Sequence, residues 1–278
     1  LFSGRDMARV LSIAMMIFTL VPAFAPLLGL GIISVAGWRA IFIAIALFLI
    51  TVVIWTVFRL PETLARENRR PFKMPLLIMA AREMFAHPTV RLSIFVQTLC
   101  MGSLLTMLTM VQPVYDTIFG RAESFPLWFG LVALMSGSAS LINAIVVVKV
   151  GMRRMVTWSL AGQIVFSSMV LVLSNMNLPD AFQFGLFVAW QTSLFFMVGM
   201  TLGNLNAMAM EPMGHIAGMA ASVIGAISTV VAAVLAAPIG LLFNGTLLPL
   251  SLGVLTMVST AFIIMLRMGR VESQLLAE

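Results

Sequence analysis

The chain has 278 residues, of which 61% are hydrophobic and only 9% are charged, against roughly 25% charged residues in soluble domains. A soluble fold of this length could not bury so much apolar surface, so the composition excludes an ordinary soluble domain and indicates that lipid solvates part of the protein. The net charge of +6 would suit nucleic acid, but the cations lie in short islands between apolar stretches, which argues against that partner.

Long stretches without a charged residue or histidine divide the chain. They cover residues 10–38, 40–58, 92–115, 124–148, 155–179, 181–210 and 216–266, and the last one breaks near its middle at Asn244-Gly245. A spanning helix needs about 20 apolar residues, and a helix satisfies its own backbone groups in lipid. We therefore predict an all-α polytopic membrane protein with eight transmembrane helices, at about 8–34, 40–58, 92–112, 126–148, 155–173, 181–202, 216–241 and 247–265.

The cations predict the orientation of these spans. With the N-terminus in the cytoplasm, the outer side receives only Arg39 and Arg121. The inner side receives Arg5, Arg9, Arg59, Arg66, Arg69, Arg70, Lys73, Arg82, Arg91, Lys149, Arg153, Arg154, Arg267 and Arg270. Because cytoplasmic loops carry the excess of Lys and Arg, we expect both termini in the cytoplasm and the spans in the cell inner membrane.

The longest polar interval predicts a boundary between two units. We expect the end of one lobe at residues 1–58, a cytoplasmic linker at 59–91, a six-helix lobe at 92–266 and a cytoplasmic tail at 267–278. Within the linker, residues 75–86 place Leu77, Ala80, Ala81 and Met84 on one helical face. This pattern is typical of a short amphipathic helix on the membrane surface, and equally of a plain linker helix without lipid contact.

Two spans carry uncharged polar stripes at helical spacing. In the third span Thr98, Gly102, Thr106, Thr109 and Gln112 share a face, and in the sixth Gly185, Ala189, Thr192, Gly199, Gly203 and Asn206 do so. Such a face can line a water-accessible cavity or allow two helices to approach closely. Because Gln112 and Asn206 suit lipid poorly, we predict a substrate cavity walled by Thr98, Thr106, Thr109, Gln112, Thr192 and Asn206, with Gln97, Gln191 and Asn204 as weaker candidates.

The seventh span carries a different stripe. Its small residues recur every four positions, at Ala217, Ala221, Gly225, Thr229 and Ala233. Small side chains let helix backbones come close in lipid, so we predict a helix-packing face there.

Catalytic and metal-binding patterns are not evident in the sequence. It has one cysteine, Cys100, inside a span, two histidines, His87 and His215, and no P-loop or helix-borne metal motif. Asp116, Glu211 and His215 lie at span ends, where hydrated interfacial residues are expected more than proton carriers. We expect no enzyme activity, no cofactor and no metal.

Several short motifs together carry a family resemblance. They are Arg5-Asp6 with Ala8-Arg9, Ala25-Pro26-Leu27-Leu28-Gly29, Gly37-Trp38-Arg39-Ala40, Leu60-Pro61-Glu62-Thr63, Gly151-Met152-Arg153-Arg154, and Asn206-Ala207 with His215-Ile216-Ala217-Gly218. On these residues the chain resembles the major facilitator superfamily, and within it the Bcr/CflA-type drug exporters that confer antibiotic resistance to bicyclomycin and chloramphenicol-like compounds. Leu30 departs from the second glycine expected after Gly29, and no acidic residue of the loop motif is evident near Val146.

The resemblance implies twelve helices in two lobes, of which this chain would supply the fifth to the twelfth and lack the first four. It implies a multidrug antiporter whose partners are small amphipathic substrates, protons and the lipid bilayer. The third and sixth spans would then line the central cavity, and the small-residue stripe of the seventh span would face a helix of the other lobe. A metabolite carrier of the same family and a non-transporting truncated membrane remnant are the alternatives.

Overall fold

The structure, a computed structural model, describes residues 25, 28–59 and 74–275 of the chain. Within these residues it contains helices and no strand. The elements are α2 (Arg39–Arg59), α3 (Met74–Ala86), α4 (Pro88–Pro113), the π-helix η2 (Val114–Ile118), α5 (Phe125–Val150), α6 (Met152–Leu173), α7 (Asp180–Met210), the 3₁₀-helix η3 (Glu211–Ile216), α8 (Ala217–Leu241) and α9 (Leu248–Leu275).

Seven helices in the described ranges are long and apolar enough to cross a membrane, which confirms an all-α, multi-pass membrane protein. They correspond to the second to eighth predicted spans. The first predicted span, at about 8–34, falls mostly outside the described residues; residues 28–36 are helical. Several helices exceed the predicted spans: α7 has 31 residues, or about 46 Å at 1.5 Å per residue, and so extends past a core of about 30 Å.

Local residues explain where several helices begin and end. Pro88 begins α4, and Pro179 precedes Asp180 at the start of α7, where a carboxylate complements the helix dipole. Gly151 separates α5 from α6 with φ of +88°, a backbone conformation that side chains with a Cβ rarely adopt. This turn lets two consecutive spans reverse direction within one residue.

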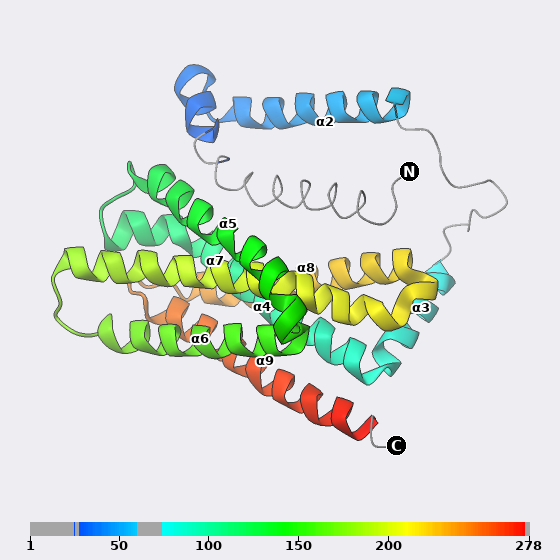
Figure 1. The fold of residues 1–278 in the computed structure, drawn as a ribbon. Helices are drawn as coiled ribbons and strands as arrows, with labels where there is room; N and C mark the ends of the chain where they lie inside the picture. Colours follow the sequence, from blue (N-terminus) through cyan, green and yellow to red (C-terminus); the bar gives the residue numbers. More distant parts are fainter. Residues whose placement is uncertain (1–24, 26–27, 60–73, 276–278) are drawn as a thin grey trace.

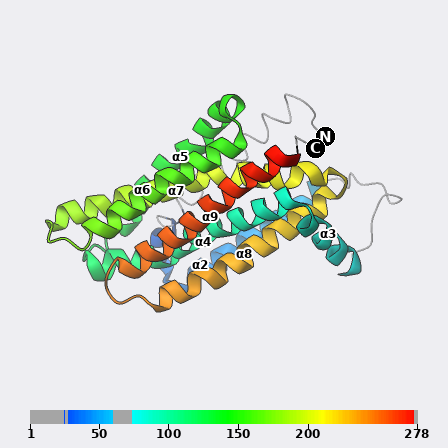
Figure 2. The ribbon, with the colours of Figure 1, turned by 90° about the horizontal axis from the view of Figure 1, so that it is seen from below.

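Helix α4 lies at the centre of the bundle and packs against α7, α8 and α9. Helix α5 packs on α7, and α6 packs on α7 and α9. Figure 1 shows the bundle from the side, and Figure 2 shows α5 and α6 near one edge with α8 near the opposite edge. Helix α2, drawn outside the bundle in Figure 1, has no buried residue, as expected of a helix surrounded by lipid or by a partner helix.

An aromatic cluster joins α4, α5 and α7 at one end of the lobe. The Tyr115 ring, fully buried in η2, lies edge-on to Phe125, Phe184 and Phe187 with centroids 5.3 to 5.8 Å apart. Its hydroxyl donates to Gln191 Oε1 at 3.2 Å. Edge-to-face rings and one buried hydrogen bond thus hold the end of α4 against α7.

Helix α3 packs onto the opposite end of the lobe. Ala80 and Met84 are buried, and Met84 joins a cluster with Ile94 of α4 and Ile224 of α8. Glu83 on the same helix lies 2.7 Å from Nε2 of His215 in η3. Helix α3 therefore contacts the bundle through both apolar and polar side chains.

Candidate functional site

The α4 residues predicted for the cavity divide between the lobe interior and its surface. Thr98 and Thr106 are buried, whereas Thr109 and Gln112 are exposed. The Thr98 hydroxyl donates to its own helix, at Ile94 O, 2.8 Å away. Two candidates therefore face other helices of the lobe, and two face outward near the C-terminal end of α4.

The α7 candidates lie on different surfaces. Thr192 is half-buried and lines a cavity of about 660 Å³ between α5, α6 and α7, which we call the lateral groove. Asn206 is exposed near the other end of α7. The lateral groove contains none of the other five candidates, so the structure does not join the six in one pocket. Their role as walls of a cavity between two lobes remains a prediction.

Several buried polar atoms of the lobe have no hydrogen-bond partner among the described residues. They are His87 Nδ1 just before α4, Gln97 Oε1 and Thr106 Oγ1 on α4, Gln191 Nε2 on α7 and Ser228 Oγ on α8. A buried polar atom without a partner costs free energy, which a water molecule or a polar group of a ligand would recover. Gln97 and Gln191 were weak candidates in the sequence, and Ser228 was missed because it lies outside the small-residue stripe of its helix, one residue before Thr229.

A reciprocal amide pair crosses from α5 to α7. Asn204 Nδ2 donates to Asn143 Oδ1 at 2.7 Å, and Asn143 Nδ2 donates back at 3.4 Å. The isolated Asn143 gave no periodic signal in the sequence, and only the packing of the two helices reveals its partner. The pair ties these helices together within the bilayer.

The small-residue stripe of α8 is exposed. Ala221, Gly225, Thr229 and Ala233 lie on the surface, and a Cβ added at Gly225 would meet no atom within 4 Å. The side chain of Ala217 is not among those described. The face of α8 that packs in the lobe consists instead of Ala220, Ile224, Ser228, Ala232 and Ala236. Whether the exposed stripe packs against another helix remains a prediction.

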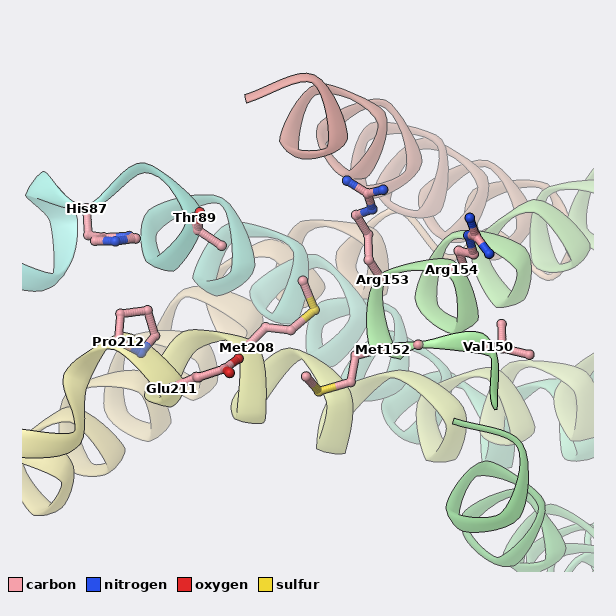
Figure 3. Close-up of a pocket in the computed structure, with 10 residues that line it drawn as sticks. His87, Thr89, Val150, Met152, Arg153, Arg154, Met208, Glu211 and Pro212 are labelled. Atoms are coloured by element: carbon pink, nitrogen blue, oxygen red, sulfur yellow. The ribbon is translucent and has the colours of Figure 1, made fainter. Parts of the chain in front are cut away.

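A second pocket, of about 440 Å³, lies at the end of the lobe where α4 begins and α7 ends. Figure 3 shows His87 and Thr89 on one side of it, Met208 and Glu211 on another, and the segment with Met152, Arg153 and Arg154 on the third. Arg153 points toward α9, where its Nη1 donates to Gly269 O at 3.3 Å. Arg153 therefore connects the start of α6 to α9, and the loop forms one wall of this pocket.

The other family-motif residues belong to the first part of the chain. Arg5, Asp6, Arg9 and Pro26 lie outside the described residues. Gly29, Trp38 and Arg39 are described, and the Arg39 guanidinium carbon lies 4.5 Å from the centroid of the Trp38 ring. Such an arginine–tryptophan pair suits the interface between lipid headgroups and water.

Among the residues that the structure describes, no three His, Cys, Asp or Glu side chains gather as ligands for a metal ion. The buried polar residues of this part are all serines, threonines, asparagines or glutamines. The interior of the lobe therefore offers hydrogen bonds without formal charge.

Comparisons with known proteins give two matches. A family model described as Major Facilitator Superfamily matches residues 1–237. The bicyclomycin resistance protein homolog of Haemophilus influenzae (strain ATCC 51907 / DSM 11121 / KW20 / Rd) is 30% identical over 175 residues, which cover 63% of this chain and 44% of that relative. The match thus spans less than half the length of the relative. No solved structure matches the chain.

Proposed function

Because the chain belongs to the Major Facilitator Superfamily, a family of transporters rather than enzymes, we propose that it acts in a secondary active transporter that exports small amphipathic drugs. The observation that carries this proposal is the similarity to a bicyclomycin resistance protein homolog over 63% of the chain. Bicyclomycin-like and chloramphenicol-like compounds are the proposed cargo. The cell inner membrane, with both chain ends cytoplasmic, is the proposed location, and the distribution of Lys and Arg supports it.

The chemistry of the lobe interior supports an uncharged cargo. A charged cargo is held by buried groups of opposite charge, and the buried polar side chains of the described residues are uncharged. The unpartnered atoms of Gln97, Thr106 and Gln191 would accept from or donate to polar groups of such a cargo, or to water that accompanies it.

Transport would follow the rocking of two lobes around a site near the membrane midplane. In this proposal the exposed α8 stripe, with Gly225 near its middle, packs against a helix of the other lobe. Thr109, Gln112 and Asn206 face the space between the lobes, and the buried Thr98 and Thr106 lie behind that wall, inside the lobe. Outward movement of cargo is coupled to proton entry, a step that rests on the family resemblance.

The proposal is tested with inverted membrane vesicles that contain the protein, in which outward export appears as uptake of radiolabelled bicyclomycin. We expect uptake when the vesicle lumen is acidified and collapse of uptake when an uncoupler is added. Uptake that persists with the uncoupler refutes proton coupling. The absence of any gradient-driven uptake of bicyclomycin or chloramphenicol by correctly folded protein refutes drug export and favours the non-transporting alternative.

Matched variants test the cavity assignment. Asn206→Leu and Gln112→Leu should reduce uptake at least about tenfold, because each removes an amide from the proposed cavity wall. Ile50→Leu, on the exposed surface of α2, is the control and should transport normally. Equal uptake by all three variants would remove the basis for assigning the cavity face.

A further inference from the structure

The lateral groove between α5, α6 and α7 has the shape of a site for a long apolar chain. Its lining follows α7 from Phe184 to Met197, thirteen residue steps, or about 20 Å at 1.5 Å per residue. One leaflet accounts for about half of a hydrocarbon core of about 30 Å. The groove is therefore longer than one leaflet is deep, and its volume of about 660 Å³ falls within the usual range for small-molecule sites, about 300–1,000 Å³.

Small residues on two helices keep the groove open. A Cβ added at Gly162 of α6 or Gly185 of α7 would meet no atom within 4 Å, and Ala189 next along α7 is exposed. The rim carries Trp158, which is 62% exposed, and Met135, which is 54% exposed. Because α5, α6 and α7 cross the membrane, this apolar rim faces hydrocarbon, and a lipid chain can enter the groove from the side.

Three polar side chains of the groove, Gln163, Thr192 and Ser193, already have hydrogen-bond partners within the protein. Ser193 Oγ donates to Gln163 Oε1 at 3.1 Å, and Gln163 Nε2 donates to Ser167 Oγ at 3.4 Å. The Thr192 hydroxyl donates to Val188 O at 2.8 Å. None of the described residues that line the groove is charged. A ligand without hydrogen-bonding groups along its length leaves these three side chains paired, and this favours an acyl chain over a polar cargo.

One end of the groove carries a cation. The guanidinium carbon of Arg121 lies 4.2 Å from the ring centroid of Phe184, and this ring lies edge-on to Trp128 with centroids 5.1 Å apart. Phe184 and Trp128 both line the groove. Arg121 itself is exposed and forms no ion pair with a carboxylate of the described residues. Its fork of N–H donors is thus free to bind a phosphate at headgroup level, just beyond the hydrocarbon.

We propose that the lateral groove binds one membrane phospholipid, with an acyl chain between α5, α6 and α7 and the headgroup phosphate on Arg121. Of the six residues predicted for the cargo cavity, only Thr192 lines this groove, and lipid binding there can be measured without transport. A chain held there fills the space that the two glycines leave between α6 and α7, and the phosphate fixes the lipid at one end of the lobe.

The test counts lipids bound to the full chain in detergent by native mass spectrometry. The protein is titrated with phosphatidylglycerol and, separately, with a diacylglycerol that has the same chains and no phosphate. We expect wild-type protein to bind one phospholipid tightly. Gly162→Leu and Gly185→Leu should each weaken binding of both lipids by about tenfold or more. A tenfold loss of affinity corresponds to about 1.4 kcal/mol, and this is close to the roughly 1.6 kcal/mol that burial of two CH₂ groups of an acyl chain contributes.

The headgroup is tested separately from the chain. Arg121→Gln should weaken phosphatidylglycerol binding about fivefold, the effect of one cation worth about 1 kcal/mol, and should leave diacylglycerol binding unchanged. Two controls match these variants. Gly203→Leu fills equally open space elsewhere on α7, and Arg39→Gln removes a cation that also lies over an aromatic ring, that of Trp38, which does not line the lateral groove.

Unchanged phospholipid binding in both glycine variants would overturn the site, as would equal loss in Gly203→Leu. If Arg121→Gln weakened both lipids equally, or Arg39→Gln matched it, the phosphate contact would be refuted. Helix content and Tm are measured for every variant. If one glycine variant does not fold, the other variant and Ala189→Leu, which fills the same groove, decide the outcome.

Discussion

Ser167 provides a sharp test of the packing between α6 and α7. Its hydroxyl is fully buried and accepts two hydrogen bonds, from Trp190 Nε1 at 3.0 Å and from Gln163 Nε2 at 3.4 Å. The Trp190 side chain is also fully buried, so the indole N–H has no access to solvent. Ser167→Ala removes the acceptor and leaves this donor without a partner, while the lost oxygen atom leaves only a small void.

Two magnitudes bound the expected effect. Leaving a buried donor unsatisfied costs about 1–3 kcal/mol in soluble proteins. Hydrogen bonds between membrane helices contribute less, about 0.6 kcal/mol on average and at most about 1.7 kcal/mol, because the unfolded chain in a membrane also finds partners. Since the stronger bond here is short and fully buried, we expect Ser167→Ala to lower the free energy of unfolding by about 1–1.7 kcal/mol.

The assay is reversible unfolding of the full chain in mixed micelles, followed by far-UV circular dichroism. Ser138→Ala is the matched control, because the exposed Ser138 hydroxyl donates only to Met135 O of its own helix. In the Trp190→Phe background, which lacks the indole donor, Ser167→Ala should cost at least about 0.5 kcal/mol less than in the wild type. An effect of Ser167→Ala no larger than that of Ser138→Ala, or an equal effect in both backgrounds, would refute the reasoning.

Three further predictions follow from the packing of single residues. Gly253→Val should lower the free energy of unfolding by about 1–3 kcal/mol, because a Cβ there would lie 2.5 Å from Ile239 Cδ1. Adding Ile239→Ala should recover part of that free energy in the same unfolding assay. Asn143→Leu should lower the free energy of unfolding by about 1 kcal/mol, because Asn204 keeps only the hydrogen bond to Met200 O of its own helix. An equal loss in the Asn204→Leu background would show that the two asparagines are not coupled. Gly225→Leu should leave the free energy of unfolding within about 0.5 kcal/mol of wild type, because the added Cβ meets open space. If the exposed stripe packs against the other lobe, the same variant should abolish vesicle uptake. Normal uptake would contradict that packing.

The positions of the membrane helices could be predicted from the sequence because each one follows from local chemistry. A run of about 20 uncharged residues in lipid must satisfy its own backbone, and it does so as a helix wherever the run occurs. Thus α2 at Arg39–Arg59 and α8 at Ala217–Leu241 fall within one residue of the predicted spans 40–58 and 216–241. Helix α7 continues eight residues past its predicted end at 202, because length beyond the hydrocarbon is not limited by hydropathy.

The buried faces of those helices were decided only by tertiary packing. In lipid, apolar residues suit the bilayer and the protein interior equally, so periodicity does not distinguish the two. On α8 the exposed Gly225 and the buried Ile224 are neighbours in sequence, and both lie on stripes of small or apolar side chains. The lateral groove beside Gly185, the partner of Asn143 and the acceptor of the Trp190 indole all depend on residues of another helix, and no spacing within one helix encodes them.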